Sequence, residues 1–583
     1  MNFLGQVNSV LWHDYVLYAI LTVGVLFTVW SAFSQYRALT HGTQVIRGKY
    51  DRKDAPGAIN HFQALSAALS ATVGLGNIGG VAVAIALGGP GAVFWMWVVG
   101  FIGMAIKTTE VTLAMLYRNT DDPENPHGGP MWVAKKGFAK FGEAWKPLGI
   151  VVGGIFCVTL LVSTVTGGNM FQAWNVAIVT EQNFGVPQIA TGIVLAVMVG
   201  AVIVGGIKRI GSVAGRLVPL MCGIYLLAAL YVVIVNIDAV PEMFRLIVTS
   251  AFSPLEAQGA FLGGTFGYAL AWGMKRALFS NEAGQGSSPI AHSAAKTDEP
   301  VREGVVAGLE PFIDTLVVCT LTSLVILASG AWNRGPEAVL EAPATVSAAG
   351  DNTWTVAPTP LPKNQVAEWV LGADQVFLVV HTQAHEDTGT DSERLFGTVV
   401  REGEGLVARW GTITSATAPR IDDPGIYGNY VGAGLTSHAF DRVTPGLGKW
   451  LVTLAAWLFA LSTMISWSYY GEQGMVYLLG ERSVLWYRLA YCVLIIVATA
   501  GFITTDAALD NLTGVGTGVM LWANIPIMLL FGHQAMTAYH SYIRRLKSGD
   551  FEKDKHAAGS ILDIVEGKVP GGGDDKDDDQ RSG

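Results

Sequence analysis

Two apolar segments of the sequence contain glycine-rich interruptions whose residue types could bind a small ligand. The first is SATVGLGNIGGVA (70–82), in which Asn77 stands among glycines. The second is RALFSNEAGQGSS (276–288), which combines glycines with Asn281 and Glu282. Each glycine lowers helix propensity by about 1 kcal/mol relative to alanine. Both segments are therefore predicted to break a helix.

A break exposes free backbone N–H groups at one new helix end and free carbonyls at the other. The N–H groups around 76–78, at a positive dipole end, could bind a carboxylate. Carbonyls near Ser70, Ala71 and Val73, with hydroxyls from another helix, would form an oxygen cage suited to Na⁺. Carbonyls beside the second break could accept an α-amino group. A site that can bind both poles of a zwitterion favours an amino acid over a sugar or an anion.

The glycines of the first segment also match the GxGxxG fingerprint of dinucleotide-binding domains. That fingerprint requires a preceding strand and an acidic residue about 20 positions further on. Here a helix-length apolar run precedes it, and no Asp or Glu follows Gly79 before Glu110. A nucleotide loop is therefore not expected. Close packing of membrane helices on small residues is the competing interpretation.

The composition is that of a membrane protein. The 583 residues are 51% hydrophobic and only 14% charged, against about 25% charged in soluble domains. A membrane helix needs about 20 apolar residues. Eleven stretches qualify: 15–35, 62–86, 92–117, 149–179, 188–207, 214–237, 262–290, 304–330, 449–478, 484–504 and 513–538. The predicted fold is an all-α polytopic membrane protein, with the first stretch retained as a span.

Lys and Arg gather in alternate loops between these stretches, which predicts the orientation. The N-terminus is expected outside and the C-terminus in the cytoplasm, in the cell (inner) membrane. Residues 331–447 form a polar outer insertion whose runs QVFLVVHTQ, LFGTVVREG and LVARWGTITS are typical of short strands. We expect a small β-rich extracytoplasmic domain there. The acidic, glycine-rich tail (541–583) is expected to be cytoplasmic and largely disordered.

The two interrupted spans are the second and the seventh, five apart, so they run in opposite directions across the membrane. The membrane part would then consist of two inverted five-helix repeats, preceded by an extra span and loop (1–61). The first repeat is 62–237, and the second is made of 262–330 together with 448–540. Paired interruptions at corresponding positions indicate a transporter site near the bilayer midplane.

Five separate stretches resemble the alanine or glycine:cation symporter family: VGLGNIGGVAVAIALGGPGAVFWMWVVGFIGMAIKTTE (73–110), GGNMFQAWNVA (167–177), GMKRALFSNEAGQGSSP (273–289), FIDTLVVCTLTS (312–323) and LFALSTMISWSYYGEQ (458–473). VGLGN is also similar to the unwound core helix of the neurotransmitter:sodium symporters. The resemblance implies the leucine-transporter type of inverted-repeat fold, Na⁺ or sometimes H⁺ coupling, and uptake of small amino acids. The insertion 331–447 is longer than the family's usual outer loop.

The family pattern and the helix-end argument agree on the substrate residues of the first break. Phe279 and Trp467 could wall a pocket that admits only a methyl or hydrogen side chain, although packing explains such aromatics equally well. The amide of Gln172 could bind substrate or join two helices. The candidate substrate-binding residues are Thr72, Gly74, Gly76, Asn77, Gln172, Phe279, Asn281 and Trp467.

The resemblance implies a sodium site in which Ser70 and Val73 lend carbonyls and Ser462 and Thr463 lend hydroxyls. The alternative for the two hydroxyls is local bonding to the preceding helical turn.

Charges inside membrane spans are functional hypotheses by default. Lys107 and Glu110 are three residues apart and are predicted to pair as a gate element. Asp314 could orient the broken helices, or carry a proton if coupling is to H⁺. Glu282 could stabilise the second break.

We therefore expect a symporter that imports small neutral amino acids, chiefly alanine or glycine, coupled to Na⁺ by alternating access. An H⁺-coupled carrier, or a sensor or channel that uses the outer insertion, is the alternative. The sequence contains no nucleophile–base pair or phosphate loop, so neither an enzyme nor an organic cofactor is expected. The expected partners are the amino-acid substrate and the bilayer, without nucleic acid. The sequence indicates no particular oligomeric state.

Overall fold

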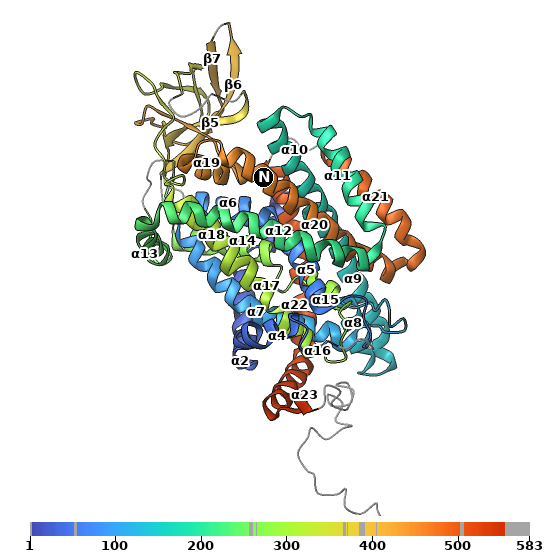
Figure 1. Cartoon of the computed structure of the whole chain (residues 1–583). Helices are drawn as coiled ribbons and strands as arrows, with labels where there is room; N and C mark the ends of the chain where they lie inside the picture. Colours follow the sequence, from blue (N-terminus) through green and yellow to red (C-terminus); the bar gives the residue numbers. More distant parts are fainter. Residues whose placement is uncertain are drawn as a thin grey trace, which may run out of the picture.

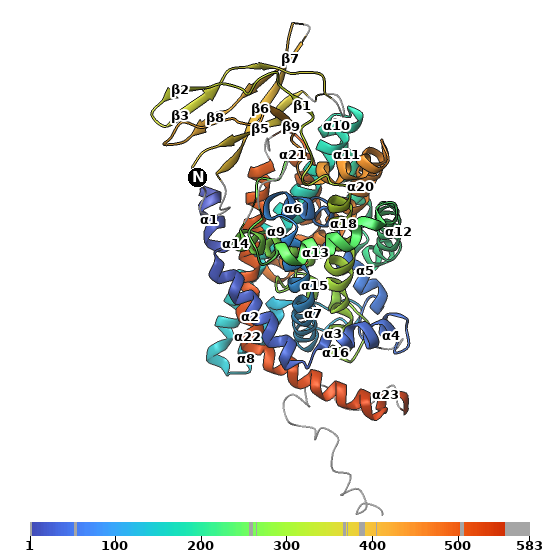
Figure 2. The ribbon, with the colours of Figure 1, turned by 90° about the vertical axis from the view of Figure 1, so that its left-hand side faces the viewer.

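The protein consists of a helical body with a β-rich part at one end (Figure 1; Figure 2). The computed structural model describes residues 3–51, 55–255, 260–263, 265–364, 369, 371–383, 391–403, 405–501 and 506–553. Helices α22 (Asp506–Ser548) and α23 (Asp550–Lys553) end at the side opposite to the strands. Helix thus continues past residue 541, and the rest of the predicted disordered tail lies outside the described residues.

The helices of the first half are α1 (Phe3–Leu11), α2 (Asp14–Trp30), α3 (Ser34–Arg37), η1 (Ala38–Gly42), α4 (Thr43–Ile46), α5 (His61–Thr72), η2 (Gly76–Gly80), α6 (Val81–Gly88), α7 (Gly91–Tyr117), α8 (Pro130–Ala139), η3 (Glu143–Trp145), α9 (Lys146–Val165), η4 (Thr166–Met170), α10 (Phe171–Phe184), α11 (Gln188–Ile203), α12 (Gly206–Val235), η5 (Ile237–Ala239) and α13 (Val240–Ser250). Those of the second half are α14 (Phe266–Asn281), α15 (Ser288–His292), α16 (Pro300–Ala307), α17 (Leu309–Pro311), η6 (Phe312–Cys319), α18 (Thr320–Ala328), α19 (Ala433–Val443), α20 (Leu447–Leu479), η7 (Glu481–Ser483) and α21 (Val484–Ala498), followed by α22 and α23.

Seven described helical stretches are long and apolar enough to cross a membrane, and a bent pair makes an eighth. Every one of the eleven predicted spans overlaps helix. Three of them coincide with α11, α14 and α21, which have only 16, 16 and 15 residues. The prediction of a multi-pass helical membrane protein is thus confirmed, with seven or eight spans of full length where eleven were predicted.

The first predicted break is present between α5 and α6. Asn60 caps α5, because its side chain accepts from the Gln63 N–H at 2.8 Å. The helix ends at Thr72, Val73 is extended, and the chain resumes as the π-helical turn η2 before α6. The two halves differ in direction by 52°. Glycine at four positions between 74 and 80 explains why the backbone leaves the α conformation here.

The second predicted break follows α14. Glu282 ends this helix in the left-handed conformation (φ 56°), and Gly284 and Gly286 follow with φ of 83° and 78°. The chain then re-enters helix as the short α15. A side chain at Gly286 would also meet Pro130, since a Cβ there would lie 2.5 Å from the Pro130 Cγ. Glycine is therefore required both for the turn and for its packing.

The predicted β-rich insertion is confirmed. Its strands are β1 (Ala338–Val339), β2 (Val346–Gly350), β3 (Thr353–Val356), β4 (Thr359–Pro360), β5 (Gly372–His381), β6 (Ser392–Glu402), β7 (Gly405–Trp410), β8 (Thr412–Thr414) and β9 (Gly425–Gly428). Six form an antiparallel half-barrel sheet in the order β1-β9-β5-β6-β7-β4, and three form the sheet β2-β3-β8. Alternate apolar residues of these strands pack into a separate small core.

Helix α19 lies between the strands and the helical body (Figure 1). Its Thr436 hydroxyl donates to the Ile78 carbonyl of η2 at 3.0 Å. On its other side, the His438 ring stacks on Tyr430 at 4.0 Å between centroids. Arg334 lies over the Tyr430 ring and donates to the Gly428 carbonyl of β9. The insertion is thus joined through α19 to the first helix break.

Candidate functional site

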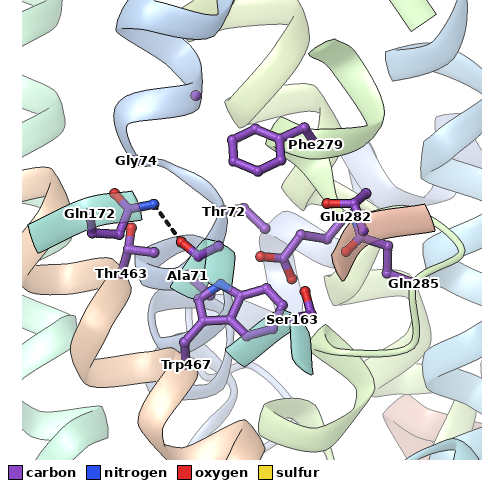
Figure 3. Close-up of a pocket in the computed structure, with 13 residues that line it drawn as sticks. Ala71, Thr72, Gly74, Ser163, Gln172, Phe279, Glu282, Gln285, Thr463 and Trp467 are labelled. Atoms are coloured by element: carbon purple, nitrogen blue, oxygen red, sulfur yellow. Dashed lines mark hydrogen bonds between the residues drawn. The ribbon is translucent and has the colours of Figure 1, made fainter. Parts of the chain in front are cut away.

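A small cavity lies between the two helix breaks, deep in the helical body (Figure 3). Its volume is about 20 Å³, which is close to the space that a single water molecule needs, so the described conformation is nearly closed around the site. It is lined by Ala71, Thr72, Gly74, Gly76, Ser163, Gly167, Gln172, Phe279, Glu282, Gln285, Thr463, Trp467 and Thr517.

Six of the eight predicted substrate residues line this cavity: Thr72, Gly74, Gly76, Gln172, Phe279 and Trp467. The other two, Asn77 and Asn281, are not among its lining residues and bond within the breaks. The Asn77 Oδ1 accepts from the Gly74 N–H at 2.8 Å. The Asn281 Oδ1 accepts from the Ala283 N–H at 3.0 Å, and its Nδ2 donates to the Thr315 Oγ1 of η6 at 3.1 Å. Both asparagines therefore hold irregular backbone in place in this conformation.

Two aromatic rings approach the backbone of the cavity closely. A Cβ added to Gly76 would lie 3.3 Å from Phe279, and one added to Gly168 would lie 2.4 Å from the Trp467 ring. In Figure 3 both rings face the space between the labelled polar side chains. Their positions limit the cavity to a ligand with a small side chain.

Two buried oxygen atoms at the cavity have no hydrogen-bond partner among the described residues. They are the Thr463 Oγ1 and the Gln172 Oε1. The Gln172 Nε2 donates to the Gly167 carbonyl at 3.0 Å, which fixes the orientation of the amide. An unpaired buried oxygen costs free energy, so these two atoms are suited to a polar ligand or a cation.

The predicted sodium ligands lie beside the first break. The Ser70 Oγ donates to the Ser462 carbonyl at 2.8 Å, and the Ser462 Oγ contacts the Ser70 carbonyl at 3.3 Å. The Ser462 hydroxyl also contacts the Phe459 carbonyl of its own helix at 2.8 Å. Val73 is the extended residue at the end of α5. A Cβ on Gly74 would lie 2.7 Å from the Thr463 Oγ1, so α5 and α20 are close here.

The predicted charged residues are all buried. Lys107 lies 3.8 Å from Glu110, as predicted, but nearer to Glu310, at 3.3 Å. Glu282 lines the cavity and accepts from the Ser287 hydroxyl at 2.5 Å. Asp314 accepts from Asn77 and from Ser280, one side chain from each break.

Several polar residues of the site were not predicted. Ser163, Gln285 and Thr517 line the cavity, and Glu310 is the nearer partner of Lys107. Glu310 lies within a predicted span, and charge inside a span is itself a signal. Gln285 lies within the second predicted break (276–288), whereas Ser163 and Thr517 have no comparable signal, because isolated Ser and Thr residues are frequent in membrane helices.

A multi-pass helical body with a polar cavity between two broken helices defines a membrane transporter. Sequence comparison identifies the family: the chain belongs to the sodium:alanine symporter family, whose profile matches residues 1–358 and 411–557. Membership confirms the resemblance and a transport function, as opposed to an enzymatic one.

Individual relatives agree with this assignment. The sodium/alanine symporter AgcS of Methanococcus maripaludis is 34% identical over 533 residues, which cover 91% of this chain and 95% of AgcS. The amino-acid carrier protein AlsT of Bacillus subtilis is 38% identical over 334 residues, covering 57% and 68% of the two chains. Among solved structures, an Eremococcus coleocola manganese transporter aligns with a TM-score of 0.44 at 11% identity, covering 88% and 94%.

Proposed function

We propose that this protein imports small neutral amino acids, alanine and glycine, in symport with Na⁺. The observation that carries the proposal is the cavity between the two breaks, with unpaired oxygens on Thr463 and Gln172 and walls made by Phe279 and Trp467. A zwitterion with a methyl or hydrogen side chain matches the polarity of the cavity, and its binding requires the cavity to widen beyond the volume of about 20 Å³ in the described conformation. The name of the M. maripaludis relative, a sodium/alanine symporter, contains both sodium and alanine.

The substrate carboxylate binds at the start of η2, where N–H groups at a helix N-terminus favour an anion. The amino group lies toward the end of α14, near the Glu282 carboxylate and the backbone carbonyls that follow Leu278. Phe279 and Trp467 then enclose the side chain. Larger amino acids are excluded because the rings already approach the glycine backbone.

Sodium binds between α5 and α20, through the carbonyls of Ser70 and Val73 and the hydroxyls of Ser462 and Thr463. Ser70 and Ser462 bond to each other in the described conformation. Ion binding therefore exchanges these bonds for coordination, which couples the ion to the separation of the two helices.

Residues 62–237, and residues 262–330 with 448–540, form inverted repeats of the leucine-transporter type in this proposal. Its support is the position of the two breaks, each in the first helix of its repeat. The N-terminus and the β-rich insertion then lie outside the cell membrane and the C-terminus lies in the cytoplasm. Transport proceeds by alternating access to the cavity from the two sides.

One Na⁺ provides enough free energy for accumulation. Crossing a potential of 100 mV releases about 2.3 kcal/mol per charge. A tenfold sodium gradient adds about 1.4 kcal/mol. The sum of about 3.7 kcal/mol corresponds to several hundredfold accumulation of a neutral substrate.

The proposal is tested by uptake of radiolabelled alanine and glycine into proteoliposomes of the purified protein. An inward Na⁺ gradient should drive accumulation that disappears when K⁺ replaces Na⁺. Uptake that is equal in the two buffers would refute sodium coupling. Accumulation driven by an imposed pH gradient alone would establish the H⁺-coupled alternative instead.

A further inference from the structure

A chain of buried ionisable side chains lies on the side of the cavity away from the β strands. It connects His61 of α5, Glu303 of α16, His292 of α15, Glu310 of α17 and Lys107 of α7. Each of these residues is at most 1% exposed. None of them is assigned to the substrate or to sodium.

The members of the chain are in direct contact. The His61 Nδ1 bonds to the Glu303 Oε2. The other Glu303 oxygen lies 2.5 Å from the His292 Nδ1, and the His292 Nε2 lies 2.7 Å from the Glu310 Oε1. The second Glu310 oxygen lies 3.3 Å from the Lys107 Nζ. The contacts between these five ionisable side chains are therefore continuous from α5 to α7.

The central trio requires an extra proton. Both ring nitrogens of His292 face a carboxylate oxygen, yet a neutral imidazole has one donor and one acceptor. Two short bonds to two carboxylates are possible only if the ring is an imidazolium or if one carboxyl is protonated. In either case Glu303, His292 and Glu310 together hold one proton more than two carboxylates and a neutral ring. This proton belongs to the trio as a unit.

The charges around the trio also call for protons. The trio itself contributes Glu303 on α16 and Glu310 on α17. The charged or titratable groups around it are Lys107 and Glu110 on α7, Arg118 just beyond α7, His61 on α5, Arg302 on α16, Tyr470 on α20 and Glu282 at the break. Arg302 is directed to Tyr50 and Tyr542. Four carboxylates thus face two permanent cations, Lys107 and Arg118. Buried charges need such compensation, and the proton held by the trio supplies part of it.

The two ends of this series of side chains suggest the direction in which a proton moves along it. At one end, Lys107 interacts electrostatically with Glu282, which lines the cavity. At the other end, His61 is the first residue of α5 and follows the exposed Asn60. The His61 Nε2 is buried and has no hydrogen-bond partner among the described residues. A small movement of the start of α5 would bring this nitrogen to the aqueous phase.

We propose that the Glu303–His292–Glu310 trio is a second, proton-specific binding site, which exchanges its proton with the cytoplasm through His61. A proton from water binds to the His61 Nε2, and the Nδ1 proton passes to the Glu303 Oε2. The neutral carboxyl group of Glu303 then rotates so that this same O–H faces His292, and its proton passes to the His292 Nδ1. Each intermediate group gains one proton and loses one. The net result is one proton moved from water to the trio.

Loss of this proton would change the contacts between the helices. A neutral His292 keeps its bond to only one of the two carboxylates, and its bare nitrogen then faces an oxygen lone pair. The junction of α15 with α16 or α17 is weakened, beside the inner end of α5. The proton site therefore stabilises the closed cytoplasmic side, an inference that rests on the proposed orientation and transport cycle.

The protonation of His292 is tested directly by ¹⁵N NMR of purified protein labelled with ¹⁵N-histidine. The His292 signals are assigned by their loss in His292→Gln. At neutral pH the signals should show that both ring nitrogens are protonated, or that a ring proton exchanges rapidly with a neighbouring carboxyl group. This protonation should be lost at alkaline pH. Glu303→Gln, which is isosteric, should shift these signals toward a neutral ring. His533→Gln, at an exposed position on α22, should leave them unchanged.

The transport consequence is tested in proteoliposomes whose internal pH is set to a series of values. The rate of alanine uptake should depend on the internal pH with wild type and with His533→Gln, and this dependence should be lost with His292→Gln and Glu303→Gln. A neutral His292 with a single ring proton and no effect of Glu303→Gln would overturn the proton site. If NMR shows the proton but neither the wild type nor any variant transports alanine, the proposed function fails and the proton site stands.

Discussion

The carboxylate of Asp314 accepts a hydrogen bond from the Asn77 amide at 2.5 Å, across 237 residues of sequence. It also accepts from the Ser280 hydroxyl at 3.0 Å. Asn77 belongs to the first helix break and Ser280 lies just before the second. One side chain of η6 therefore connects both irregular segments that enclose the cavity.

Removal of this connection should destabilise the closed site. Asp314→Asn replaces two charge-assisted bonds, each worth about 1.5–3 kcal/mol, by weaker or repulsive contacts. We expect a lower melting temperature in detergent and a loss of uptake of at least about tenfold, a change that corresponds to about 1.4 kcal/mol. Asp238→Asn, at an exposed position, is the matched control. Unchanged stability and uptake in Asp314→Asn would refute a connecting role.

The ring of Trp467 should set the size of the substrate. Trp467→Leu enlarges the cavity, because the indole lies against Gly168. Competition assays with labelled alanine should then show inhibition by valine or leucine, which wild type does not bind. Trp486→Leu replaces a tryptophan that is 73% exposed and should leave selectivity unchanged. An unaltered inhibition profile in Trp467→Leu would remove the ring from the wall of the site.

The unpaired hydroxyl of Thr463 should contribute to sodium affinity. Thr463→Ala should raise the Na⁺ concentration for half-maximal uptake by about tenfold, since one buried oxygen ligand is worth about 1–3 kcal/mol. Selectivity among amino acids should change little, and Thr463→Ser should restore most of the affinity. Thr537→Ala, whose hydroxyl bonds to its own helix, controls for loss of a threonine. Sodium dependence identical to that of wild type would exclude Thr463 from the ion site.

Acidic pH on the side of the membrane that bears the β strands should loosen α19. Burial, with the nearby Arg334 and Arg442 cations, lowers the pKa of His438 to about 3, well below the usual value of about 6.5. The unfolded chain therefore binds a proton that the folded one does not between these values, and stability falls as the pH drops from about 6.5 toward 3. The raised pKa of Asp441, which is also caused by burial, acts in the opposite direction, because its carboxyl holds its proton longer when folded.

The change can be followed by limited proteolysis of the insertion as a function of pH. His438→Phe keeps the stack on Tyr430 without a titrating group and should flatten the pH dependence below 6. His13→Phe, in the exposed loop before α2, should retain it. Proteolysis that does not depend on pH in wild type would contradict the expected loss of stability.

The strands between β3 and β8 should be dispensable for transport. The family profile omits residues 359–410, and Thr355 of β3 pairs directly with Thr412 of β8. A short turn that replaces 358–410 would therefore join neighbouring strands as a hairpin and keep α19 in place. Uptake by this variant should remain within about twofold of wild type. Loss of uptake by a correctly folded variant would show that the insertion is needed for transport.

The sequence was sufficient to predict features with a local cause. Clustered glycines weaken a helix wherever they occur, so both breaks were predicted at the residues where α5 and α14 end. Alternating apolar residues between turns identified β5, β6 and β7. Length was predicted less well, because α11, α14 and α21 are shorter than the apolar stretches that contain them.

The contacts that define the sites were decided by the tertiary structure. The bonds between Ser70 and Ser462 join residues 392 apart, and no pattern in the sequence places Glu303 and Glu310 on either side of His292. Such contacts depend on how helices pack and which faces they present, and hydropathy within a membrane span hardly constrains either. The sequence by itself thus determined the class of protein, the helix breaks and most of the cavity residues. The tertiary structure alone showed that Asp314 bonds to Asn77 and Ser280 at once, and it assembled the buried histidine–glutamate chain.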